Sequence, residues 1–128
     1  MKAAARALAI CGLVFSIGAA PSGLPPLNQV MREKLVHSQK ILEAVVTSRW
    51  VDLETHSREL EQLTHDRRWM VLNYPEYATH SAAFVRTVQA LHAAAARRDL
   101  EETPKAYVAM TMQCVECHRY LARQRIAR

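Results

Sequence analysis

Two cysteines and a histidine stand close together near the end of the chain, in the run CVECH from Cys114 to His118. Two thiols three residues apart lie on one face of a helix, where both can form thioethers to the vinyl groups at one edge of a porphyrin. The histidine that follows can offer a neutral imidazole nitrogen to the iron as the proximal ligand. The spacing of Cys114, Cys117 and His118 therefore predicts one covalently attached haem c.

Three other uses of these residues fit the sequence less well. A thioredoxin-like dithiol needs a preceding strand and a helix N-terminus at the first cysteine, and no strand pattern precedes Cys114. A structural zinc ion needs a fourth ligand, but the other histidines are scattered singly. A disulfide between cysteines three residues apart on a helix is strained. Haem attachment is the interpretation that the spacing favours.

The first twenty residues have the layout of a secretory signal. A basic start with Lys2 and Arg6 precedes an apolar stretch, which small residues follow at positions 18–20. The stretch is shorter than the roughly 20 apolar residues that a membrane-spanning helix needs, although an uncleaved anchor is the alternative. We expect a signal peptide over residues 1–20, a domain over 21–128, no membrane span after cleavage, and a periplasmic location in a bacterium.

The net charge and the number of cysteines argue against two kinds of function, nucleic-acid binding and that of a free dithiol. Without Lys2 and Arg6, the chain of 128 residues keeps 15 basic and 12 acidic residues, a balance of +3. This is too mild to indicate nucleic-acid binding, and no basic stripe alternates with aromatic residues. The two cysteines that remain after cleavage are Cys114 and Cys117, and an oxidising compartment does not preserve a free dithiol. Their thiols should therefore be bonded to a cofactor.

Apolar residues recur at helical spacing, and no useful stretch alternates with the period of a strand. The helices expected from this pattern span about 26–47, 48–66 and 75–98, with a fourth that begins at Thr103 as N-cap and Pro104 as first residue. Long helices with short links predict an all-α, antiparallel up-down-up-down four-helix bundle. The core stripe expected on the first helix is Leu27, Met31, Leu35, Leu42 and Val45.

A second axial iron ligand must come from upstream, because only ten residues follow His118. Counting back from the links places the region of Lys34 level with Cys117, and Met31 and Leu35 lie within one turn of that level on either side. Met31 is the candidate distal ligand, although a methionine on an apolar stripe can equally be core. His37, one turn deeper in the same helix, is its rival.

The helices and the CVECH motif together resemble the class II c-type cytochromes, the cytochrome c-prime family. The resemblance implies a bundle with the haem on the last helix and the distal position on the first. Members with a methionine there are low-spin, and members with an apolar residue are five-coordinate and bind NO or CO. Met31 lies near that position, and Val30, Arg32 and Leu35 compete for it. Dimers through the first two helices are also implied.

These observations lead to three hypotheses about function. The first is an electron carrier, not an enzyme, in which His118 and Met31 hold the iron and a redox protein docks against the basic rim. The alternative is a five-coordinate cytochrome that binds NO or CO, with Met31 only packing. The weakest is a peroxidase-type haem enzyme, which would need His37 to face the iron.

Overall fold

The computed structural model describes residues 27–66, 68–69 and 72–124, and these form four helices and no strand. The helices are α1 (Leu27–Thr47), α2 (Trp50–Thr64), α3 (Pro75–Ala96) and α4 (Glu102–Arg123). The prediction of an all-α chain with four helices is confirmed. The predicted signal peptide lies outside the described residues. Within the described part of the chain, no helix has the combination of length and hydropathy that crossing a membrane requires.

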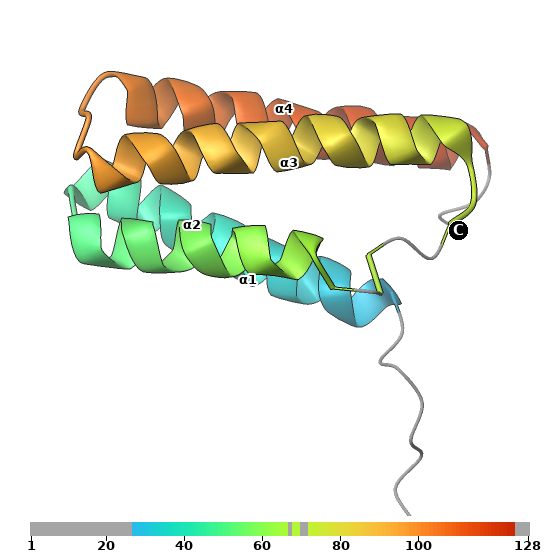
Figure 1. Ribbon diagram of the computed structural model, residues 1–128, viewed down its shortest axis with the longest axis horizontal. Helices are drawn as coiled ribbons and strands as arrows, with labels where there is room; N and C mark the ends of the chain where they lie inside the picture. The colour runs from blue at the N-terminus through green and yellow to red at the C-terminus, as the bar shows by residue number, and fades with distance from the viewer. Residues whose placement is uncertain (1–26, 67, 70–71, 125–128) are drawn as a thin grey trace, which may run out of the picture.

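The four helices pack in a closed order that is consistent with a four-helix bundle. Each helix contacts the next one along the chain, and α4 also contacts α1, although this last contact is the smallest. The α1–α2 and α3–α4 links lie at one end of the molecule, and the segment between α2 and α3 lies at the other (Figure 1). The second half of α4, with the motif, therefore comes to the end where α1 begins and α2 leads into α3.

The core runs through all four helices, and the stripe predicted for α1 is right only in part: Met31 and Val45 are partly buried against the core. Leu35 and Leu42, expected inside, are 57% and 45% exposed. The buried residues of α1 are Val30, Lys34, Ile41 and Ala44. Apolar residues lie on more than one face of this helix, and the face with Val30, Ile41 and Ala44 is the one that is buried. A shift of one residue turns a helix by about 100°, which accounts for the wrong prediction.

The two short links use the same turn, although no glycine follows Gly23 in the sequence. Ser48 and Arg98 have φ of 53° and 54°, in the left-handed region. In each link the N–H of the left-handed residue and the N–H of the residue after it bond back to the helix: Arg98 and Asp99 donate to the carbonyls of Ala95 and Ala94 at 2.9 and 3.1 Å. This is the Schellman pattern of helix C-termini, which usually places glycine at the left-handed position.

The start of α4 also differs from the prediction of Thr103 as N-cap. The helix begins at Glu102, and the Asp99 carboxylate accepts hydrogen bonds from the N–H groups of Glu101 and Glu102 at 3.1 and 2.9 Å. The bond from Glu102 contributes most to lowering the pKa of Asp99. A carboxylate that reaches two N–H groups displaces the hydroxyl of Thr103, which is buried inside the first turn.

Replacing Arg98 with glycine should stabilise the protein. A non-glycine residue in the left-handed region costs about 1–2 kcal/mol, and the extra backbone entropy of glycine offsets part of the gain. We expect Arg98→Gly to raise the free energy of unfolding, measured in urea, by about 0.5–1 kcal/mol. The control Arg97→Gly, at an ordinary φ of −86°, should lower it. A lower stability of Arg98→Gly than of the unchanged chain would contradict this account of the link.

Candidate functional site

Cys114, Cys117 and His118 lie in the second half of α4, beside two adjoining cavities. The first, the α1–α3–α4 cavity, has a volume of about 300 Å³ and is lined by Cys117 and His118. The second, the α1–α4 cavity, has a volume of about 400 Å³ and is lined by Cys114 and His118. Both thiols are free and half-buried. Each cavity is thus bordered by one cysteine of the motif, and His118 borders both cavities.

Aromatic side chains form the inner wall of the α1–α3–α4 cavity. The rings of Trp69 and Phe84 stack with centroids 5.4 Å apart and an interplanar angle of 25°. The hydroxyl of Tyr77 donates a hydrogen bond to the backbone carbonyl of Trp69, which ties the segment before α3 to that helix. Tyr77 and His80 line the same cavity. The wall is therefore flat, largely apolar and held in place by the fold.

Met31 lies opposite the motif and lines both cavities together with His118. Of its competitors, Val30 is buried in the core, whereas Arg32 and Leu35 line only the α1–α4 cavity. His37 lines neither cavity. Its ring instead contacts α2, so its suggested place beside the iron has no support in the geometry. Ligation of iron by Met31 stays a prediction.

Lys34 is the residue of this site that sequence reasoning overlooked. It lines both cavities, and it is only 7% exposed. Its Nζ lies 3.5 Å from the ring centroid of Phe84 and 4.8 Å from that of Trp69. No carboxylate among the described residues lies within ion-pair distance of this nitrogen. Counting from the links did reach this position, but a lysine is expected at the surface and gave no signal of burial.

Burial and the charge of Lys34 both shift pKa values at this site. Burial lowers the pKa of Lys34. Burial also raises the pKa of Cys117, and the nearby Lys34 ammonium acts against this rise. Burial, followed by the same ammonium, lowers the pKa of His118. His118 is an exposed residue, and the lowering of its pKa favours the neutral imidazole that binds metals. Cys117 lacks the lowered pKa of a reactive dithiol.

The residues around the two cavities fit a haem. Aromatic and aliphatic walls suit the faces of a porphyrin, and two sulfurs and an imidazole on one helix match its covalent and axial bonds. Among the described residues around these cavities, the buried Nε1 of Trp69 has no hydrogen-bond acceptor, and the Lys34 ammonium has no carboxylate partner and lies over two aromatic rings. Buried donors without partners are rare in folded proteins and point to a missing group. A haem would bring acidic side chains and a metal to this place.

Comparison with known proteins adds no relative of this chain. No family model matches it, and neither a curated protein nor a solved structure does. The interpretation of the site therefore depends on its own residues and their geometry.

The unpaired ammonium of Lys34 should destabilise the chain when no haem is attached. A buried polar group without a partner costs about 1–3 kcal/mol, so in a chain carrying Cys114→Ser and Cys117→Ser we expect Lys34→Met to raise the free energy of unfolding by that amount. Urea unfolding measures it. The control Lys40→Met, on the exposed face of the same helix, should change stability by less than about 0.5 kcal/mol. Equal effects of the two substitutions would show that Lys34 carries no burial penalty.

Proposed function

We propose that this chain is an exported, periplasmic mono-haem c-type cytochrome that carries electrons, built as an antiparallel up-down-up-down four-helix bundle. One observation carries the proposal: the face of α4 with Cys114, Cys117 and His118 borders two cavities whose opposite wall holds Met31. In this proposal the two cysteines hold the haem through thioethers and His118 is the proximal ligand. The haem supplies a one-electron iron couple.

Met31 is the residue of α1 best suited to the distal position. It shares both cavities with His118, and so does Lys34. A thioether has a free lone pair at any pH, whereas an ammonium must lose a proton before it can bind a metal. Methionine opposite histidine fills the sixth position, tends to raise the potential of the iron and leaves small ligands no direct entry. These properties favour electron transfer over ligand binding.

The exposed surface beside the motif suits docking of another redox protein. Arg32, which lines the α1–α4 cavity, is exposed on α1, and Arg119 and Arg123 are exposed on α4 just after the motif. Positive charges near an exposed haem edge steer an acidic partner into orientation and speed encounter. Dimerisation through α1 and α2 is proposed for the same chain, because Leu42, Val46 and Val51 are exposed apolar residues of these helices.

The alternative function, binding of NO or CO by a five-coordinate haem, has one observation in its favour. The α1–α4 cavity, about 400 Å³, adjoins Met31 and leaves room for a small ligand if the thioether stays away from the iron. The two proposed functions therefore differ in whether the sulfur of Met31 is bonded to the iron. Absorption spectroscopy distinguishes these two states.

Absorption spectra of the purified oxidised and reduced protein, with and without CO, test the proposal. We expect a low-spin spectrum that CO leaves unchanged. Met31→Ala should become high-spin and bind CO, because the sixth position opens. The control Met112→Ala replaces a methionine of α4 that is 47% exposed and lines neither cavity, and its spectrum should stay low-spin.

Two results would contradict the proposal in different ways. A high-spin spectrum of the unchanged protein that shifts with CO would establish the five-coordinate alternative. A low-spin spectrum that survives Met31→Ala would show that another side chain binds the iron, and Lys34→Ala would then test the other residue common to both cavities.

A further inference from the structure

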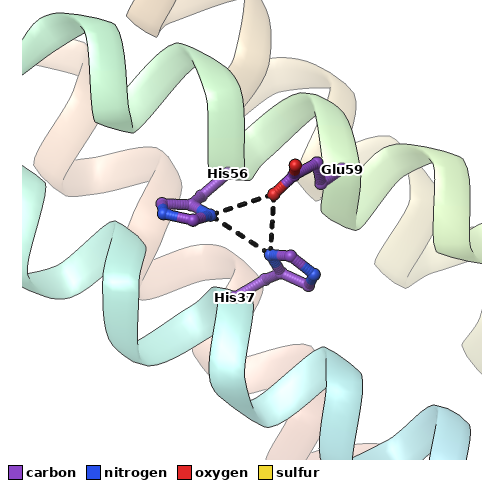
Figure 2. Close-up of side chains that lie close together, drawn as sticks. All are labelled: His37, His56 and Glu59. Atoms are coloured by element: carbon purple, nitrogen blue, oxygen red, sulfur yellow. Dashed lines mark hydrogen bonds and ion pairs between the residues drawn. The ribbon is translucent and has the colours of Figure 1, made fainter.

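Three metal-ligating side chains converge between α1 and α2, outside the two cavities. His37 comes from α1, and His56 and Glu59 come from one face of α2, three residues apart (Figure 2). The Nδ1 atoms of the two histidines are 3.2 Å apart. The Glu59 Oε2 lies 3.2 Å from the Nδ1 of His37 and 3.1 Å from that of His56. The three atoms thus form a nearly equilateral triangle.

This triangle has the size of one face of a metal coordination shell. Zinc binds histidine nitrogen at about 2.0–2.1 Å and carboxylate oxygen at about 2.0–2.2 Å, so neighbouring ligand atoms stand roughly 3.0 Å apart in an octahedron and 3.4 Å in a tetrahedron. The observed edges of 3.1–3.2 Å fall between these values. An ion about 2.1 Å from all three atoms would lie about 1 Å outside their plane.

Hydrogen bonds alone do not account for the three close contacts between these atoms. Each Nδ1 carries at most one hydrogen and the carboxylate carries none, so two hydrogens are available for three close contacts. Stacking does not explain the approach either, because the two rings are tilted by 46° with centroids 5.4 Å apart. In the described part of the chain, the ion-pair partners of Glu59 are these two histidines. One cation bound by all three atoms would satisfy their lone pairs at once.

The fold holds the three side chains in place and leaves them accessible. Ile41 on α1, with Leu53 and Leu60 on α2, are fully buried and fix the two helices against each other around the cluster. The side chains of His37 and His56 are 21% and 26% exposed, and that of Glu59 is 43% exposed. An ion can therefore enter from solvent, and little rearrangement is needed to bind it.

We propose that His37, His56 and Glu59 form a binding site for one divalent transition-metal ion of the zinc class, which links α1 to α2. Two imidazoles and a carboxylate suit Zn²⁺ and its neighbours in the first transition row, whereas Mg²⁺ and Ca²⁺ prefer oxygen ligands alone. Three protein ligands leave at least one position for water. The site is separate from the CVECH motif, and it does not depend on the function proposed above.

Calorimetric titration of the purified full chain with Zn²⁺ tests the site. We expect saturable binding of one ion, with no comparable binding of Mg²⁺. His56→Gln and Glu59→Gln should each weaken Zn²⁺ binding more than about 100-fold, since even loss of an outer-shell contact costs 10–100-fold. The control is His92→Gln, which disrupts a similar pair, His92 Nδ1 to Glu61 Oε2 at 3.0 Å, for which the described residues offer no third ligand. This variant should bind Zn²⁺ like the unchanged chain.

X-ray absorption at the zinc edge of the unchanged chain gives a result that does not depend on folding of the variants. We expect nitrogen and oxygen at about 2.0–2.2 Å and no sulfur at about 2.3 Å. A sulfur shell would place the ion on Cys114 and Cys117 and overturn the proposal. Absence of saturable binding, or equal affinities in folded His56→Gln, Glu59→Gln and His92→Gln, would overturn it as well.

Discussion

The sparse contact between α1 and α4 is the constraint on which the site depends. The other neighbouring helices pack closely, whereas α1 and α4 touch little, and both cavities lie along this seam. Cys114, Cys117 and His118 face the seam from α4, and Met31 and Lys34 face it from α1. Closer packing of these two helices would fill the space with side chains. Their separation leaves a slot with sulfur and imidazole on one wall and a thioether and an amine on the other.

Neighbouring residues of α1 contribute to both proposed sites, the cavities beside the motif and the cluster of His37, His56 and Glu59. Lys34 faces α3 and α4, and His37, less than one turn later, contacts α2. Residues three apart on a helix project about 60° from each other, which is enough to reach two different neighbours. The apolar residues Val30, Ile41 and Ala44 of the buried stripe anchor the helix. A buried stripe that carries a lysine is a poor choice for core packing alone, since buried polar side chains are costly without partners.

Periodicity was enough to predict the four helices, because amphipathic spacing and proline positions such as Pro75 act locally. It did not identify which stripe of α1 faces inward. Leu35 and Leu42 are larger and more apolar than Val30 and Ala44, and only the packing of the neighbouring helices decides between them. Thr103 is not the N-cap because the carboxylate of Asp99, four residues earlier, reaches forward to the N–H groups of Glu101 and Glu102. The motif residues were predictable from their spacing, whereas Lys34 and the cluster of His37, His56 and Glu59 depend on contacts between helices far apart in sequence.

The most direct measurement of the central claim is the intact mass of the protein isolated from the periplasm. Thioether bonds survive denaturation, so the attached group stays with the polypeptide in the mass spectrometer. The account predicts the mass of the chain without its signal peptide plus that of one haem, located on the peptide that contains Cys114 and Cys117. A bare polypeptide whose two cysteines are free would contradict it.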